Sequence, residues 1–428
     1  MGLNRSATAQ PETLVSMKSN VATVTIKVEW TPATAIVKAN GVVLTNDVSV
    51  YNSIPVNEEG MVFITTEEGA QLTKLGCPYN QLRALDVTNN TALTELLCNN
   101  NYLTALDVTK NTKLIRLYCN RNQLTALDIT KNTALERLWC FANQLTELDI
   151  TKNTALQILT CFYNFLTELD ATKNTALIVL NCYSNQFTTL DISKNTALEK
   201  LWCANNQLTT LDVTNNMALT ELTCTENQLT ILDVANNAAL EWLNCSENQL
   251  TALDVTNNTM LTGLSCAYNQ LTELNVTNNM ALTRLACFNN QLTELDVAKN
   301  MALDRMYCEN NQLTALDVTK NTALEGLNCE NNQLTALDIT KNTALKWLSA
   351  NGQQIEVSIL AGATTFSNPV LYKTPEGEQK VRIEETEYVY QADVPIIGDT
   401  IEFTTTPPTK IKYGAAFGGT ITLSPSER

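Results

Sequence analysis

The residues in this sequence best suited to chemistry are its cysteines, which recur at every twenty-first position from Cys77 to Cys329 and number thirteen. Thiols can form disulfides, ligate zinc or act as nucleophiles. If each cysteine lies on a strand of one parallel sheet, equivalent Cβ atoms stand about 4.8 Å apart, beyond the roughly 3.5–4.5 Å of a disulfide. The number is odd, and the spacing lacks the C-x-x-C pairs of zinc sites. We therefore expect buried free thiols that pack as small apolar side chains, with no metal and no cofactor.

The sequence offers few residues or motifs for catalysis. The chain has no histidine, which removes the commonest general base and the commonest transition-metal ligand. It contains no P-loop, nucleophile elbow or glycine-rich phosphate loop. We expect Glu309 and Glu330 to be too exposed and isolated for a tuned acid–base pair. The sequence therefore predicts a protein that is not an enzyme, and its net charge of −16 argues against a nucleic-acid partner.

The cysteines belong to a repeat with a fixed period and no insertion. Around Cys140, apolar residues stand at offsets −5, −2, 0, +5, +8 and +10 from the cysteine, and asparagines stand at +3 and +13. Leu138 and Cys140 alternate with Arg137, Trp139 and Phe141, as in a strand with one buried face. Such a repeat is typical of a solenoid, in which each copy is a coil that buries its apolar face only by stacking on the next.

The repeated polar residues have expected structural roles. The +3 asparagines, from Asn80 to Asn332, and the +13 asparagines, from Asn90 to Asn342, stand at turns where a side-chain amide can bond backbone groups. Aspartates at +9, with Asn275 as the exception, are expected to cap a further turn.

The repeat resembles the leucine-rich repeat L-x-x-L-x-L-x-x-N-x-L, with cysteine in place of the third leucine. It is most similar to the cysteine-ladder branch of the internalin-like bacterial surface proteins. This resemblance implies a leucine-rich-repeat solenoid of about 13–14 coils. It further implies a parallel β-sheet on the concave face, turns or short 3-10 segments on the convex face, and small β-rich caps at both ends.

The pattern divides the chain into four parts. Residues 1–16 are expected to form a flexible N-terminus, 17–69 a β-rich N-terminal cap, 70–352 the solenoid, and 353–428 a β-rich C-terminal module. In the N-terminal cap, strands are expected at 21–28 and 61–65, with a hairpin at Asn40-Gly41. In the C-terminal module, short β runs are expected at 356–360, 380–383, 388–390, 400–404 and 420–423.

The chain contains no run of eighteen apolar residues, so we expect no membrane-spanning segment. The first residues lack the apolar core of a signal peptide, which fits a cytoplasmic protein or a mature chain. The family resemblance favours the second, a secreted or cell-surface bacterial protein whose signal peptide has been removed. No anchor is visible after Arg428, and we expect a monomer.

Offsets −3, −1 and +1 point outward from the strands, so the fold does not dictate their residue types. In five neighbouring coils they bring together aromatic and basic residues, joined by Tyr163 at the strand end and flanked by Arg121. This candidate ligand-binding set comprises Arg116, Tyr118, Arg137, Trp139, Phe141, Phe162, Tyr163, Tyr183, Lys200 and Trp202. A second candidate set comprises Arg284, Phe288, Arg305 and Tyr307.

Two interpretations of these sets remain open. Contiguous exposed aromatics with arginine are typical of a binding site, whereas aromatics also brace neighbouring strands, and Glu309 and Glu330 could pair with the second set's arginines. The first interpretation, supported by the resemblance, is an adhesin-like module that binds a protein, or less readily a polysaccharide, of host or cell-surface origin. The alternative is a spacer rod that holds its terminal modules apart and binds no ligand.

Overall fold

The structure is a computed structural model that describes residues 12–31, 37–40, 42–66, 71–350 and 352, together with seven strands between residues 355 and 423. The chain divides into two compact units, Met1–Leu211 and Asp212–Arg428.

The first unit begins with strand β1 (Glu12–Ser19), which pairs antiparallel with β6 (Met61–Thr66) and with β8 (Leu82–Asp86). The expected flexible segment 1–16 is therefore wrong for residues 12–16. The sequence pattern in this strand is weak, but β1 pairs with strands on both sides, and Val15 and Met17 are buried. Strand β2 (Thr23–Thr31) pairs antiparallel with β5 (Asp47–Pro55) and β7 (Gln71–Gly76).

The hairpin expected at Asn40-Gly41 is present. Strands β3 (Val37–Ala39) and β4 (Val42–Val43) pair antiparallel, and Asn40 adopts a left-handed φ of 46°. The Asn40 side chain donates to the carbonyl oxygens of Pro55 and Met61 and accepts from the Phe63 amide. Gly41 lies outside the described residues.

Each later coil contributes one three-residue strand at offsets −3 to −1, and these strands lie in register in a parallel sheet within each unit. In the first unit, β7 pairs with the first of them, and the series runs β9 (Glu95–Leu97), β10 (Arg116–Tyr118), β11 (Arg137–Trp139), β12 (Ile158–Thr160), β13 (Val179–Asn181) and β14 (Lys200–Trp202).

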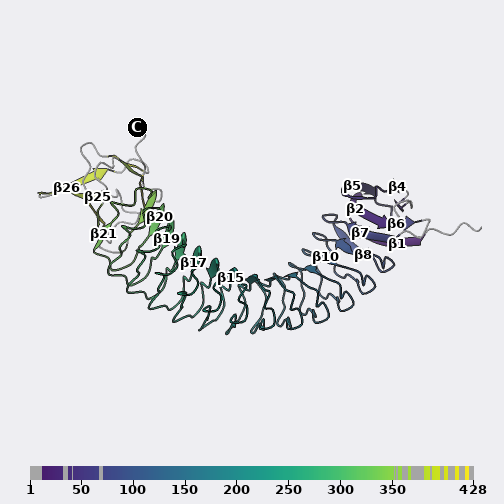
Figure 1. Cartoon of the computed structure of the whole chain (residues 1–428). Coiled ribbons are helices and arrows are strands. Elements are labelled where there is room, and N and C mark those ends of the chain that lie inside the picture. The colour runs from purple at the N-terminus through teal and green to yellow at the C-terminus, as the bar shows by residue number, and fades with distance from the viewer. Residues whose placement is uncertain are drawn as a thin grey trace, which may run out of the picture. The chain divides into compact units, whose positions relative to one another are not determined.

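In the second unit the series runs β15 (Glu221–Thr223), β16 (Trp242–Asn244), β17 (Gly263–Ser265), β18 (Arg284–Ala286), β19 (Arg305–Tyr307), β20 (Gly326–Asn328) and β22 (Trp347–Ser349). Figure 1 shows the labelled strands of each unit side by side. Turns and irregular segments connect them, and the described residues contain no helix. The predicted parallel β-solenoid is confirmed.

Burial follows the repeat. Leu138, Cys140, Leu145 and Ile150 are fully buried, and every other coil repeats this pattern with small variations. All thirteen cysteines are buried and free, as the sequence predicts. Burial raises the pKa of thiols such as that of Cys119 to about 12, because the interior disfavours the thiolate.

The +3 asparagines join coils to one another, as expected. Asn143 donates from Nδ2 to the carbonyl oxygens of Cys119 (3.1 Å) and Cys140 (3.0 Å). Its Oδ1 accepts from the amide of Leu124 at 3.0 Å. The +13 asparagines act similarly at the other turn, where Nδ2 of Asn132 donates to the carbonyl oxygens of two residues of the preceding coil.

The +9 aspartates close turns within their own coil. Oδ1 of Asp149 accepts from the amide (2.9 Å) and the hydroxyl (2.7 Å) of Thr151. These two hydrogen bonds hold the pKa of Asp149 below its usual value. Asn275, the exception in sequence, accepts the same pair from Thr277. The expected capping role is confirmed.

The remaining strands of the second unit are β21 (Ala336–Asp338), β23 (Ile355–Ser358), β24 (Thr365–Ser367), β25 (Lys380–Glu385), β26 (Tyr388–Pro395), β27 (Thr400–Glu402), β28 (Lys410–Tyr413) and β29 (Thr420–Leu423). Each of the five expected β runs overlaps a strand, whereas β24 and β28 were not predicted. The division into a flexible terminus, two caps and a solenoid otherwise stays a prediction.

The buried ladder predicts a specific thiol count. A thiol-modifying reagent at pH 8 should label almost no cysteine in the native protein, since the thiols are buried and protonated. After denaturation without reductant it should label all thirteen. Fewer than thirteen in the denatured sample would contradict the free-thiol assignment, and rapid labelling before denaturation would contradict burial.

Candidate functional site

The strand register fixes where the expected site residues stand. Arg116 lies beside Arg137 and Tyr118 beside Trp139 on neighbouring strands. Continuing along the −1 positions of the first unit, Thr160 and Asn181 follow Trp139 before Trp202 is reached. The structure therefore places all of these residues on one sheet, but Trp202 stands three strands from Trp139.

The aromatic side chains form two stacks across the strands. At the −1 positions the rings of Tyr118 and Trp139 stack with centroids 4.4 Å apart. At the +1 positions Phe141, Phe162 and Tyr183 stack at 4.3 and 4.4 Å, each pair with an interplanar angle of 11°. Together we call these rings the aromatic ladder.

The ladder continues around the end of the strands. The Tyr163 ring packs edge-on against Phe162 and Tyr183, at 5.4 and 5.0 Å, and remains 55% exposed. Phe165 follows at offset +4 and is half exposed. The sequence analysis missed Phe165, although the +4 position is glutamine in most coils and this exception is a usable signal.

Tyr163 also occupies an unusual backbone position. The residue at +2 has a left-handed φ of about 50–58° in every coil from Tyr79 to Asn331. Asparagine tolerates this conformation well and fills the position in several coils. Arg121, Ala142 and Tyr163 fill it in the three coils that hold most of the ladder.

The basic residues differ in their contacts. Arg116 forms a 3.1 Å ion pair with Glu95. The guanidinium of Arg121 lies 6.0 Å from the Phe141 ring centre, and Lys200 Nζ lies 5.8 Å from the centre of its neighbour Trp202. These are long cation–π distances. Within the part of the chain that the structure describes, Arg137 forms no ion pair.

Tyr183 shows that the ladder is partly desolvated. The pKa of Tyr183 is raised mainly by burial, and further by the charge and the hydrogen bond of the neighbouring Tyr163 side chain. Arg121 opposes this shift, so the guanidinium and both tyrosines lie within electrostatic reach of one another. The hydroxyl groups of this tyrosine pair can donate and accept hydrogen bonds.

Two other tryptophans have a structural role that separates them from Trp139. The Trp242 ring covers Gly263 on the next strand, where an added Cβ would lie 2.2 Å from the ring. Trp347 covers Gly326 in the same way. Such a ring shields backbone that glycine leaves bare. Trp139 instead lies between Tyr118 and Thr160 and is 38% exposed.

The second candidate set is less coherent. Arg284 and Arg305 lie side by side on β18 and β19 and are both exposed. Phe288 packs edge-on against Tyr268, whereas Tyr307 packs against Trp347. The four residues therefore share a face without forming one ring stack.

Glu309 is more buried than the sequence analysis predicts, since it was expected to be exposed. Its Oε2 accepts no hydrogen bond from the described residues. Burial, and then the charge of Glu330, raises the pKa of Glu309 to about 7. Glu309 forms no ion pair with Arg284 or Arg305 in the described part of the chain, so the expected pairing is absent for this residue.

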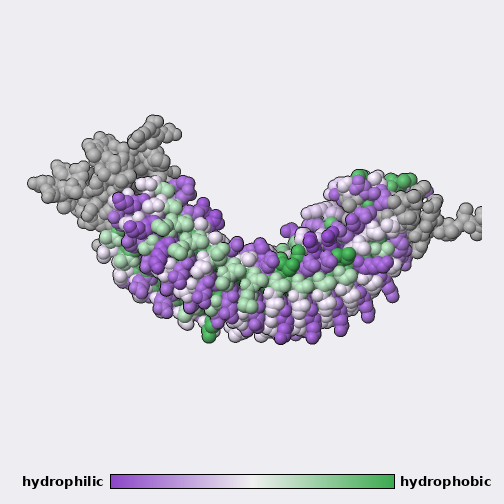
Figure 2. Space-filling view, viewed as in Figure 1, coloured by the Kyte–Doolittle hydropathy of each residue, from purple (hydrophilic) through white to green (hydrophobic). Residues whose placement is uncertain are grey.

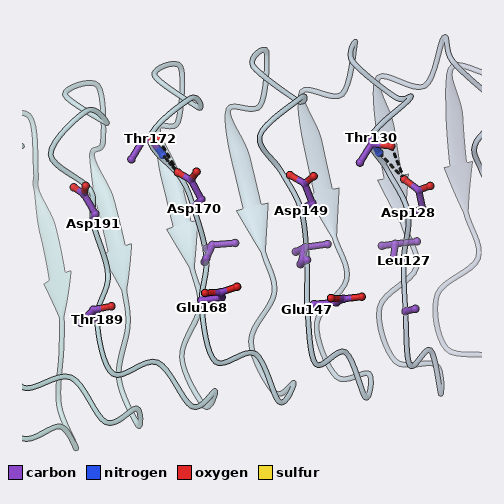
Figure 3. A pocket seen from close by; sticks show the side chains of 13 residues that line it. Leu127, Asp128, Thr130, Glu147, Asp149, Glu168, Asp170, Thr172, Thr189 and Asp191 are labelled. Carbon is purple, nitrogen blue, oxygen red and sulfur yellow. Dashed lines mark hydrogen bonds between the residues drawn. The ribbon is translucent and has the colours of Figure 1, made fainter.

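A groove of about 950 Å³ follows the ladder's coils on the stretch after the +3 turn. It is lined by two rows of carboxylates with leucines between them (Figure 3). These carboxylates belong to Asp128, Asp149, Asp170, Asp191, Glu147 and Glu168. Because the four aspartates are engaged in turns, the groove is mainly a product of the repeat. Figure 2 shows the hydrophilic stripes that such repetition produces.

No group of three or more histidine, cysteine, aspartate or glutamate residues among those described is arranged to hold a metal ion. Among the same residues, no helix has the length and apolar character needed to cross a bilayer.

Comparison with solved structures identifies the class of protein. The functional domain of InlJ from Listeria monocytogenes, which includes a cysteine ladder, superposes with a TM-score of 0.67 at 39% identity. The match covers 68% of this chain and 66% of that one, just under two thirds of its length. A leucine-rich-repeat protein from Leptospira interrogans matches at 0.58 and 28% identity over 63% of this chain and 75% of its own.

An internalin, InlF from Listeria monocytogenes, shares the fold, with a TM-score of 0.57 and 23% identity over 64% of this chain and 84% of its own. No protein-family model and no curated protein matches the chain. The period, the parallel sheet and the buried ladders define a leucine-rich-repeat solenoid. The chain is similar in sequence and fold to the internalin-like leucine-rich-repeat proteins that carry a cysteine ladder.

The tryptophan–glycine pair can be tested by a double-mutant cycle. Gly263→Ala should lower the free energy of unfolding by about 1–3 kcal/mol, because the new methyl group overlaps the Trp242 ring. In a Trp242→Ala background the same change should have little effect. Gly76→Ala serves as the control, since its added Cβ meets Lys27 Cβ at an ordinary 3.5 Å. Equal losses in both backgrounds, measured by chemical denaturation, would contradict the assignment.

Glu309 predicts a pH-dependent stability difference. Its folded pKa of about 7 exceeds the usual 4.5, so its contribution to stability is lost as pH rises from about 4.5 through 7. Glu309→Gln should therefore stabilise the protein more at pH 8 than at pH 5. Glu325→Gln is the control. The hydrogen bond and charge of Lys346 lower the pKa of Glu325, so its contribution is present at both pH values and is lost only as pH falls below about 4.5. Chemical denaturation should show a difference between pH 5 and pH 8 for Glu309→Gln and nearly none for Glu325→Gln.

Proposed function

We propose that this chain is a non-catalytic recognition module, secreted or displayed at a bacterial surface, that binds a protein ligand through the aromatic ladder. The observation that carries the proposal is the grouping of partly exposed rings over neighbouring strands, with Trp202 further along the same sheet. The grouped rings are those of Tyr118, Trp139, Phe141, Phe162, Tyr163 and Tyr183. An aromatic surface of this kind, rimmed by arginine, is typical of interaction sites.

Sheet bracing alone accounts poorly for this arrangement. Where a ring has a bracing role in this protein, it covers a glycine, as Trp242 and Trp347 do. Tyr163 and Phe165 lie beyond the strand, and both are exposed. Their positions favour contact with a partner molecule.

The internalin-like relatives support a surface role, and the leucine-rich-repeat fold generally presents binding faces rather than catalytic centres. The match to InlJ spans 66% of that domain, so secretion, display and an adhesin-like role all belong to the proposal.

The proposal can be tested with arrays of purified extracellular proteins and of glycans. The Trp139→Ala/Trp202→Ala variant should lose capture of any specific protein by at least roughly tenfold, as for hot-spot aromatics, with an unchanged unfolding midpoint. Trp242→Ala/Trp347→Ala is the matched control. It also removes two tryptophan side chains, but from sites where the ring covers a glycine. It should reduce stability while leaving capture intact.

Capture that survives in the Trp139→Ala/Trp202→Ala variant would contradict the site. The absence of any specific protein ligand would favour the alternative function, a spacer that holds terminal modules apart.

A further inference from the structure

The geometry of the aromatic ladder restricts what can touch it. Phe141, Phe162 and Tyr183 stack almost parallel at 4.3–4.4 Å, so each ring covers the face of its neighbour. The Tyr118–Trp139 stack does the same. Because the stacking direction runs from strand to strand, the atoms that point away from the sheet are ring edges. The ladder therefore presents edges to a ligand and keeps most ring faces covered.

Ring edges and ring faces attract different chemistry. The face of an aromatic ring is electronegative and the edge is electropositive. A sugar packs its C–H groups against an open face, whereas carboxylate oxygens are attracted to edges. The outer face of Phe141, which is the start of the longer stack, has Arg121 over it. Within the two stacks, open faces for sugar stacking are therefore scarce.

The charges on the same face have the same sign as the ring edges. At offsets −3, −1, +1 and +2 of the five coils from Cys119 to Cys203, every charged residue is basic. These residues are Arg116, Arg121, Arg137 and Lys200. Arg116 is partly neutralised by Glu95, but Arg137 forms no ion pair among the described residues. This is unusual on a chain with a net charge of −16.

The same coils are acidic elsewhere. The groove behind the +3 turn is lined by six carboxylates and no basic residue (Figure 3). An anionic ligand is repelled by that groove and attracted to the ladder, so the charge pattern selects both the ligand and the face that it meets.

From this complementarity we propose that the ladder's ligand is an acidic polypeptide segment of a partner protein. Its carboxylates contact the arginines and the ring edges, while its aliphatic carbons pack along the stacks. The Tyr163–Tyr183 pair, whose hydroxyls bond each other, donates its remaining hydroxyl proton to it. This inference rests on the proposed function, because it identifies the chemistry of the ligand for the same site.

The inference is tested by selecting a displayed random dodecapeptide library on the immobilised full-length protein, with a glycan array in parallel. Peptides retained by the wild-type chain should be enriched in aspartate and glutamate. For a selected peptide, the Arg116→Gln/Arg121→Gln/Arg137→Gln variant should bind at least roughly tenfold more weakly, as expected for lost charge-assisted hydrogen bonds. Binding should also weaken as salt concentration rises.

The control is Lys131→Gln/Lys152→Gln/Lys173→Gln, which removes the same charge from exposed lysines at +12 in the ladder's coils. It should change binding less than twofold, and the unfolding midpoints of both variants should match that of the wild type.

The outcomes separate the two proposals. Retained peptides without acidic enrichment, or a glycan hit lost in Trp139→Ala/Trp202→Ala, would overturn the acidic-ligand inference and leave the ladder as a binding site. Binding unaffected by both the arginine and the tryptophan variants would overturn both proposals, as would no binding of any peptide or glycan.

Discussion

The structure depends on one repeated interaction, in which a buried asparagine amide bonds the backbone of two successive coils. Asn143 contacts backbone groups of its own coil and of the coil before it. At this corner the chain turns inside the protein, where an unpaired carbonyl or amide would cost about 1–3 kcal/mol. One side chain satisfies three such groups. Because the same contact recurs in coil after coil from Asn101 onward, a change in repeat length would misplace it, and the period is fixed.

A fixed period divides the residues of each coil into two groups. The inward positions are held to leucine, cysteine, asparagine and a few substitutes by packing and hydrogen bonding. The outward positions on the sheet are free to vary, and in the first unit they hold the aromatic ladder and its arginines. The cysteines belong wholly to the first group, since burial raises their pKa and removes their reactivity. The cysteines are therefore structural, and the variable outward positions carry the proposed function.

The repeat made the fold and the members of the ladder predictable from sequence, because a residue's offset from the cysteine determines whether it points inward or outward. What could not be predicted depends on contacts between coils. The pairing of Trp242 with Gly263, the burial of Glu309 and the edge-on display of the stacked rings arise from side-chain geometry across strands. Phe165 was missed because it lies beyond the turn, outside the strand offsets whose direction the repeat determines. Strand β1 was missed because residues 12–16 alternate too weakly to indicate pairing with two partners.

The +2 position combines a fixed backbone conformation with a variable side chain. Its left-handed backbone is a consequence of the turn before the buried asparagine, and a residue other than glycine or asparagine there is strained by about 1–2 kcal/mol. Asn100 and Asn205 fit this conformation, and between them Arg121 and Tyr163 do not. Both strained residues contact the ladder, and strain retained at a surface often marks a functional position. In the second unit Glu226 and Glu247 occupy the same conformation without an aromatic stack. Strain alone therefore does not locate a site. Its coincidence with exposed rings and with the basic side chain of Arg121 extends the proposed binding surface beyond the strand and onto the turn.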